Sequence, residues 1–288
     1  MSKIIQITLL LFIASLARIN AQCTRENPEN LLSSKTYGKI KKLTYYRCYT
    51  TYSFGAATEK REQYSYETRQ FDQEGKLNNV EIFDYYGIKC KYVFSYDSLQ
   101  NLISEKSYDA NSQLQLTIFR KYDDRHNILE ENTYEFEEGR FYSKFQYKYD
   151  VNNSLIERIS YSSSNTVNSQ YKFEYKYDSE KKVIEKYKPK TNYDRIFFKY
   201  DNDGNLIEKI IYNYYDPKES DHFFEDKFTW KYDAKGNVIE ETKYFSNGSI
   251  EYKKGYVFQY DNTGNWIKYI YSENDIQKYS IEREIEYY

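Results

Sequence analysis

The amino-acid sequence predicts an all-β protein in which tandem antiparallel β-hairpins form one long twisted sheet, open or partly rolled. Three observations support this fold class. Aromatic and polar residues alternate over strand-length segments, a Tyr-Asp pair ends each of these segments, and the whole unit recurs along most of the chain. Alternation with a period of two gives a strand one apolar face. The 37 Tyr and 17 Phe also favour pleated, half-buried surfaces.

The recurring unit is marked most clearly by its Tyr-Asp pair. Weaker copies, such as Phe71-Asp72 and Tyr108-Asp109, fall between the clear ones, so the true unit is about 12 to 14 residues long, which suits one strand and one turn. A continuous antiparallel meander is therefore expected from about Lys39 to the C-terminus. The clear pairs are Tyr96-Asp97, Tyr122-Asp123, Tyr149-Asp150, Tyr177-Asp178, Tyr200-Asp201, Tyr232-Asp233 and Tyr260-Asp261.

Each unit also carries a turn signal directly after the aspartate. Asp at the first turn position can accept a backbone N–H from two residues further on, and Gly at the fourth position adopts a left-handed conformation without a Cβ penalty. This chemistry encodes a short hairpin loop with a bulge. The predicted structural turn residues are Asp201, Gly204, Asp233, Gly236, Asp261 and Gly264.

The turn fixes which residues of the two strands face each other. If Asp201 and Asn205 close the loop, Tyr200 lies opposite Leu206 and Lys199 opposite Ile207. The same register places Tyr232 opposite Val238 and Tyr260 opposite Trp266. Aromatic and aliphatic residues form favourable cross-strand pairs, worth roughly 0.2 to 1 kcal/mol each.

The first residues predict export from the cell. Residues 1–21 have a basic start at Lys3 and a short apolar stretch, which is typical of a signal peptide cleaved near Ala21. Cys23 raises lipidation as an alternative, although the residues before it fit a lipidation signal poorly. An oxidising compartment favours one disulfide among Cys23, Cys48 and Cys90, whose pairing the sequence leaves open. We expect an irregular N-terminal cap with the first strands over residues 22–60 and the hairpin array over residues 61–288.

The segment from Phe198 to Ile207 resembles the YD repeats of the Rhs family. The resemblance covers roughly Asp72 to Ile267 and is most specific at Tyr232 to Val238 and Tyr260 to Trp266. The resemblance implies hairpins aligned in a long twisting sheet, which in long arrays of that family coils into a shell around a toxic cargo domain. Asn205, Asn237 and Asn265 stand where the family often has Arg. The units vary in length, no cargo domain follows the last one, and so few units are not expected to close a shell.

No constellation of residues in the sequence predicts catalysis or a cofactor. His126 occupies a turn position and His222 lies in a longer connection, and neither belongs to a nucleophile or metalloprotease motif. The aspartates of the Tyr-Asp pairs would line one edge of the sheet, where Ca²⁺ binding is an alternative to turn capping. Capping explains each aspartate by itself, so we expect no catalytic residue, no cofactor and no metal.

The aromatic face of the sheet is the best candidate for binding. Tyr and Trp rings present flat apolar faces with polar edges, which suit contact with a sugar or another protein. The alternative is that most of these rings only cover one another and the Lys stems. The candidate ligand-binding residues are Trp230, Trp266, Tyr232 and Tyr260.

The sequence therefore predicts an exported, non-enzymatic binding or scaffold protein of the periplasm, envelope or cell surface, with carbohydrate or another envelope protein as partner. The alternatives are a secreted carboxylate-dependent glycoside hydrolase and a remnant of a polymorphic-toxin shell. The net charge of −2 is spread along the chain, which disfavours nucleic acid, and no segment after the signal is long and apolar enough to span a membrane. An outer-membrane barrel is not expected, because Lys148, Lys176 and Lys231 would charge one face and Glu157, Glu208 and Glu240 the other. Ligand identity, oligomeric state and closure of the sheet stay open.

Overall fold

The computed structural model describes residues 37–53, 56–61, 66–84, 86–135, 140–188, 193–214 and 224–288, so the predicted signal peptide, Cys23 and His222 lie outside the described residues. All regular structure in the described residues is strand, and none of these segments is a helix that could cross a bilayer. The strands are β1 (Ile40–Ser53), β2 (Ala56–Arg61), β3 (Glu67–Phe71), β4 (Leu77–Asp84), β5 (Gly87–Tyr96), β6 (Leu102–Asp109), β7 (Leu114–Tyr122), β8 (Ile128–Glu135), β9 (Arg140–Tyr149), β10 (Leu155–Tyr161), β11 (Val167–Lys172), β12 (Glu174–Tyr177), β13 (Val183–Tyr187), β14 (Tyr193–Tyr200), β15 (Leu206–Tyr214), β16 (Asp226–Tyr232), β17 (Val238–Tyr244), β18 (Ile250–Tyr260), β19 (Trp266–Glu273) and β20 (Ile276–Tyr287).

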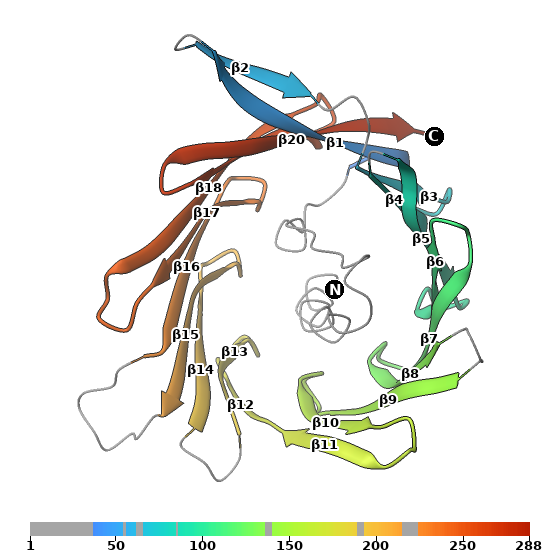
Figure 1. Cartoon of the computed structure of the whole chain (residues 1–288). Coiled ribbons are helices and arrows are strands. Elements are labelled where there is room, and N and C mark those ends of the chain that lie inside the picture. Colours follow the sequence, from blue (N-terminus) through green and yellow to red (C-terminus); the bar gives the residue numbers. More distant parts are fainter. Residues whose placement is uncertain are drawn as a thin grey trace.

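The strands form one antiparallel sheet that curves into a nearly closed ring (Figure 1). Successive strands pair from β3 to β11 and again from β12 to β20. The ring closes through β1, which pairs with β20 from Ile40 to Tyr49 on one side and with β3 from Lys42 to Tyr45 on the other. One seam remains at Phe173, where a single extended segment stops pairing with β10 and begins to pair with β13.

The all-β meander is confirmed, and the closure goes beyond what the repeats predict. So few hairpins were not expected to close, and they do not close by pairing with one another. The closing strand β1 precedes the repeats and carries no Tyr-Asp pair. Its partner β20 lies more than two hundred residues further along the chain, since Tyr46 donates a hydrogen bond to Glu284 at a separation of 238 residues.

The predicted turn recurs at eleven places within the described residues. In each, the N–H of the first residue donates to the carbonyl of the fifth, and the N–H of the fourth donates to the carbonyl of the first. The fourth residue has a positive φ whether it is glycine, as at Gly204, Gly236 and Gly264, or not, as at His126 and Lys181. The first residues are Asp72, Asp97, Asp109, Asp123, Asp150, Ser162, Asp178, Asp201, Asp233, Phe245 and Asp261.

The register beside the turn confirms one prediction and corrects another. Tyr200 lies opposite Leu206 as expected, but Lys199 lies opposite Glu208 and not Ile207, because the predicted bulge inserts one residue into the return strand. The same bulge brings Tyr232 opposite Val238 and Tyr260 opposite Trp266.

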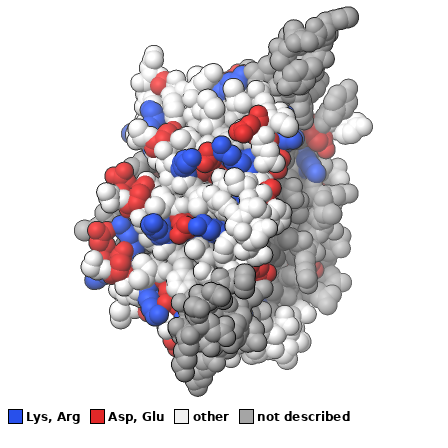
Figure 2. Space-filling view, turned by 90° about the vertical axis from the view of Figure 1, so that its left-hand side faces the viewer, with Lys and Arg blue, Asp and Glu red and all other residues white. Residues whose placement is uncertain are grey.

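The bulge also decides where the charges lie. It brings each lysine two residues before a turn aspartate opposite a glutamate of the return strand, with ion-pair distances of 2.5 Å for Lys148–Glu157 and 2.8 Å for Lys231–Glu240. The expectation that these lysines and glutamates occupy opposite faces was therefore wrong. Figure 2 looks onto the outside of the wall that contains β14 to β18 and shows bands of alternating positive and negative side chains. The ion-paired face is thus the outward one, and the aromatic face points inward.

The core lies on the inward face where the closing strands meet the last hairpins. Its largest members are Trp266, Tyr45 and Tyr269, which are 2%, 1% and 0% exposed. Aromatic rings pack here in tilted and edge-to-face pairs with centroids 5.3 to 6.3 Å apart. The buried cluster comprises Ile40, Leu43, Tyr45, Val238, Tyr256, Trp266, Tyr269 and Ile281.

The two cysteines that the structure describes do not pair with each other. Cys48 on β1 and Cys90 on β5 are both buried, and no disulfide joins them. Cys48 lies opposite Ser280 while Cys90 lies opposite Ile82 and Asp109, so different strands separate the two thiols. Of the disulfides that the sequence allows, the one between Cys48 and Cys90 is therefore not formed.

The shared turn predicts opposite effects for two substitutions. Gly236→Ala is expected to lower the free energy of unfolding by about 1 to 2 kcal/mol, because φ is +83° at Gly236 although nothing lies within 4 Å of an added Cβ. Lys181→Gly is expected to raise it by up to about 1 kcal/mol, because Lys181 has a φ of +62°. Urea denaturation of the two variants measures both changes, and a loss in Lys181→Gly would contradict the account.

Candidate ligand-binding surface

The tyrosine of the Tyr-Asp pair joins one hairpin to the next. Between hairpins the ladder begins only at Glu208 opposite Thr229, so Leu206 has no ladder partner on that side. The Tyr232 hydroxyl donates to the Leu206 carbonyl at 2.7 Å, and burial, reinforced by the nearby Asp201 carboxylate, raises the pKa of Tyr232 to about 12. Tyr96 and Tyr122 make the equivalent bonds at 3.0 and 2.7 Å. The hydroxyl explains the use of tyrosine rather than phenylalanine before Asp97, Asp123 and Asp233.

This tyrosine bond predicts a stability difference between two identical substitutions. Tyr232→Phe is expected to cost about 1 to 2 kcal/mol, because it leaves the Leu206 carbonyl without its donor. Tyr200→Phe is the matched control, since the structure describes no hydrogen bond of the Tyr200 hydroxyl, and it is expected to change stability by less than about 0.5 kcal/mol. Equal losses in thermal unfolding of the two variants would rule out the assigned role.

The turn aspartates are bound within their own loops and to neighbouring turns. Asp123 accepts the N–H groups of Arg125 and Asn127 at 2.9 and 2.8 Å through one oxygen, and the Asn127 amide at 3.0 Å through the other. Burial alone would raise the pKa of Asp123, but these hydrogen bonds hold it below its usual value. Asp201 and Asp233 accept the same pair of backbone bonds, and Asp261 accepts the N–H of Asn265.

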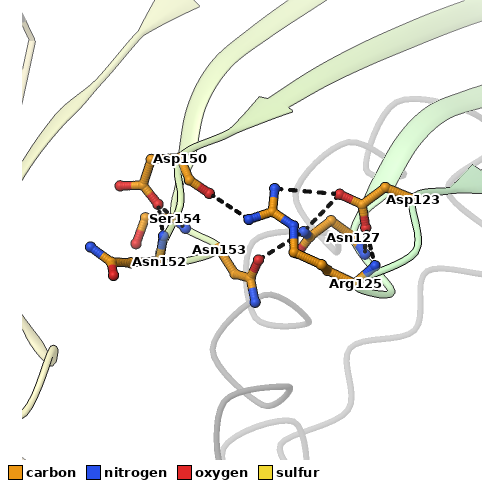
Figure 3. Close-up of polar contacts among 7 residues, drawn as sticks. All are labelled: Asp123, Arg125, Asn127, Asp150, Asn152, Asn153 and Ser154. Atoms are coloured by element: carbon orange, nitrogen blue, oxygen red, sulfur yellow. Dashed lines mark hydrogen bonds and ion pairs between the residues drawn. The ribbon is translucent and has the colours of Figure 1, made fainter.

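Asparagine at the fifth turn position links adjacent turns, as Figure 3 shows. Asn127 donates to the Asn153 side chain of the next turn at 3.1 Å, and the Arg125 guanidinium donates to the Asp150 carbonyl at 3.1 Å. Asn265 similarly donates to the backbone of Tyr37 at 2.7 Å. Asn237 donates to the Tyr260 hydroxyl of the next hairpin at 2.7 Å, whereas the Asn205 amide donates to Asp201 of its own turn at 2.9 Å.

The four predicted ligand-binding aromatics lie in different surroundings. Trp266 is in the core, with the Arg283 guanidinium 3.9 Å from its ring centroid. Tyr260, opposite Trp266, donates to Asp233 of the neighbouring turn. Tyr232 makes the bond to Leu206 described above. Trp230 is half-buried, stacks on Phe228 with centroids 5.9 Å apart, and donates to Glu241 at 3.1 Å.

A cleft of about 550 Å³ opens between β13 and β14 at the edge that carries the Tyr-Asp turns. The short strand β13, which has five residues, pairs with β14 at only two described positions, Glu185 opposite Phe197 and Lys186 opposite Ile196. Beyond these two paired positions, no further pairing of described residues joins β13 and β14 on the way to their turns. The lining residues are Asp178, Ser179, Glu180, Lys182, Ile184, Phe198, Lys199, Tyr200, Asp201 and Asn202.

The cleft lacks two contacts that other hairpins have. The Tyr200 hydroxyl makes no bond to the preceding hairpin within the described residues. Lys199 has no ion pair in the part of the chain that the structure describes, and its opposite residue Glu208 pairs with Lys227 at 2.8 Å. The sequence does not indicate this site, since Phe198, Lys199 and Tyr200 follow the same local pattern as the other units. The available signal was the interval from Asp178 to Asp201, the shortest between clear Tyr-Asp pairs.

Comparisons with known proteins give only distant likenesses. No family model and no curated protein matches the chain. A porin-like protein from Bacteroides uniformis is 9% identical, with 87% of this chain and 100% of that chain covered and a TM-score of 0.37. A porin-like protein from Bacteroides vulgatus is 14% identical over 86% of this chain and 98% of that one, with a TM-score of 0.26.

A third solved structure, that of TcdB2-TccC3-Cdc42, is 15% identical over 83% of this chain, with a TM-score of 0.29. The chain spans only 14% of that much longer protein. At these TM-scores the likenesses carry no argument about function.

Proposed function

We propose that the protein is an exported, non-enzymatic binding or scaffold protein of the cell envelope or surface, which holds a carbohydrate or protein ligand at aromatic side chains of its sheet. The observation that carries the proposal is the cleft between β13 and β14. It combines an aromatic ring (Phe198), a phenol hydroxyl without a described hydrogen bond (Tyr200) and an ammonium without a described ion pair (Lys199). Most of the residues that line the cleft are polar or charged, which suits a ligand with many hydrogen-bonding groups, such as a carbohydrate.

The surrounding structure favours binding with little rearrangement. Both turns that flank the cleft are closed by their own backbone bonds, from Asp178 to Lys182 and from Asp201 to Asn205. An unbroken series of paired strands holds β14 through β20 to β1, whereas the seam at Phe173 lies on the other side of the cleft. A site on such a scaffold loses little conformational entropy when a ligand binds.

The carboxylates of the cleft support binding over hydrolysis. Asp178 and Asp201 each accept two backbone N–H groups, and Glu180 pairs with Lys182 at 2.6 Å. Burial would raise the pKa of Asp201, but hydrogen bonds from Asn205 and Asp203 lower it. A glycosidase needs a carboxylic acid with a raised pKa beside a second carboxylate. The secreted hydrolase and the toxin-shell remnant remain the alternatives for the experiment.

The test is a glycan panel scored for both retention and cleavage. We expect retention without turnover, and about tenfold weaker binding in Lys199→Ala. Lys231→Ala is the matched control, because Lys231 occupies the same turn position but pairs with Glu240 on the opposite strand, and it is expected to bind normally. Cleavage that survives Lys199→Ala would favour the hydrolase. Retention of no glycan and no envelope protein would favour the toxin-shell remnant.

A further inference from the structure

A row of charged residues crosses the aromatic face of the sheet. The row is formed by the eighth residue after the aspartate of each Tyr-Asp pair, which lies on the return strand. Lys209, the eighth residue after Asp201, shows the face: it lies opposite both Phe198 and Phe228, so it shares the aromatic face of the sheet. Six hairpins carry a charge at this position. In chain order these residues are Glu105, Glu131, Arg158, Lys186, Lys209 and Glu241.

The acidic members of this row all have ion-pair partners within the described residues. The Arg120 guanidinium lies between Glu105 and Glu131, at 3.1 and 2.9 Å. Lys254 lies 2.9 Å from Glu241. Buried charges in pairs of this kind compensate each other's loss of hydration.

The three basic members in the middle of the row lack such partners. Arg158, Lys186 and Lys209 have no ion pair in the described part of the chain, and the buried Arg158 Nε has no hydrogen-bond acceptor. Each lies over an aromatic ring instead. Arg158 is 4.9 Å from the centroid of Phe145 and Lys186 is 4.0 Å from that of Phe173. Lys209 lies 5.7 Å from the Phe228 centroid.

The cost of this arrangement is clearest at Lys186. Burial lowers the pKa of Lys186 to about 8, and repulsion from Lys209 and Arg158 contributes to the shift. Burial also lowers the pKa of Lys209, with partial opposition from Asp226. On the side of Arg158, Glu131 forms its ion pair with Arg120 at 2.9 Å, and Arg158 acts on Glu131 only through a longer-range attraction. Half-buried cations without counter-charge destabilise a fold, so a function is the expected reason to keep them.

We propose that Arg158, Lys186 and Lys209 form a binding site for an acidic oligosaccharide. Its carboxylates or sulfates pair with the three cations, and its sugar rings stack on neighbouring aromatic side chains such as Tyr171, which is 42% exposed. Lys186 and Lys209 lie two strands apart, a separation of about 10 Å across the sheet that is close to the length of a disaccharide unit. Arg158 is offset along the strands, because it lies opposite Tyr171 whereas Lys186 lies opposite Tyr175. The inference rests on the proposed function and names the class of ligand for the aromatic face.

The test compares two lysine substitutions on the same face. Lys186→Met removes a cation without an ion pair, and we expect it to weaken binding of an oligogalacturonate or heparin hexasaccharide about tenfold or more while raising the melting temperature. Lys254→Met is the control. It leaves Glu241 buried without its ion pair, so it is expected to lower the melting temperature and leave oligosaccharide affinity unchanged.

Three results would overturn this inference. The first is equal affinity for a neutral cellohexaose and the acidic hexasaccharides. The second is a Lys186→Met variant that melts lower and binds as the unmodified protein does, which would give Lys186 a packing role only. The third is tighter binding of a poly-glutamate peptide than of either acidic hexasaccharide. In the first and third cases the protein still binds a ligand, so the proposed function stands, whereas retention of no glycan and no protein removes both proposals.

Discussion

Replacing Trp266 by alanine is expected to lower the free energy of unfolding by about 3 to 5 kcal/mol. The side chain is 2% exposed, and its ring centroid lies 5.3 Å from that of Tyr269 and 6.1 Å from that of Tyr45. The Arg283 guanidinium lies 3.9 Å from the same centroid. Tyr45 belongs to the closing strand β1, so the cavity would form where the ends of the sheet are joined. Loss of the indole would also leave Arg283 without its aromatic partner.

Urea denaturation measures this loss, with Trp230→Ala as control. Trp230 is half-buried, and we expect its replacement to cost about 1 to 2 kcal/mol. The chain has two tryptophans, so each variant retains one indole whose fluorescence follows unfolding. Equal losses in the two variants would contradict the placement of Trp266 in the core. Ligand binding that disappears in Trp266→Ala together with the fold would say nothing specific about a binding role for that residue.

Thr44→Pro is expected to open the ring at a cost of at least about 3 kcal/mol. Thr44 lies in the middle of β1, opposite Glu284 of β20 and Thr68 of β3, so the chain has ladder partners on both sides at this point. Proline removes one N–H donor and is not tolerated in a central strand. Because hairpin repeats are stabilised mainly by their immediate neighbours, β5 to β10 should stay folded while the closure is lost.

Small-angle scattering and circular dichroism distinguish these two effects. The radius of gyration should rise in Thr44→Pro, while most of the strand signal is retained. Asn202→Pro is the control, because Asn202 is exposed at the second position of a turn, where proline is accepted. An unchanged radius in Thr44→Pro would show that β1 is not needed to hold the ring, and a complete loss of strand signal would show that the hairpins depend on closure.

The hairpins could be predicted from the sequence because their determinants are local. Asp233, Gly236 and Asn237 specify one loop within five residues, and the loop fixes Tyr232 opposite Val238. The same loop forms with Lys181 or His126 at the left-handed position, so the aspartate and the strand pattern are sufficient to define it. The predicted bulge shifts the return strand by one residue, so that Lys199 lies opposite Glu208 and not opposite Ile207.

Features that depend on distant residues could not be predicted in this way. The pairing of β1 with β20 joins segments at opposite ends of the chain, and neither carries a sequence signal for the other. Trp266 and Trp230 looked equivalent as aromatic anchors, yet only Trp266 lies beneath the closing strands. Tyr200 and Tyr232 have the same local context, yet Tyr200 lines a cleft beside the short strand β13 while the Tyr232 hydroxyl donates to a carbonyl.

The position of β1 also determines the order in which the molecule can fold. Hairpins can form as soon as two neighbouring strands have been made, but the long edge of β1 has to wait for β20, the last strand of the chain. Contacts between such distant segments form slowly, and an unpaired strand edge invites association with other chains. A chain released before Ile276 would therefore keep its hairpins but expose that edge, and aggregation is the expected fate of truncated products.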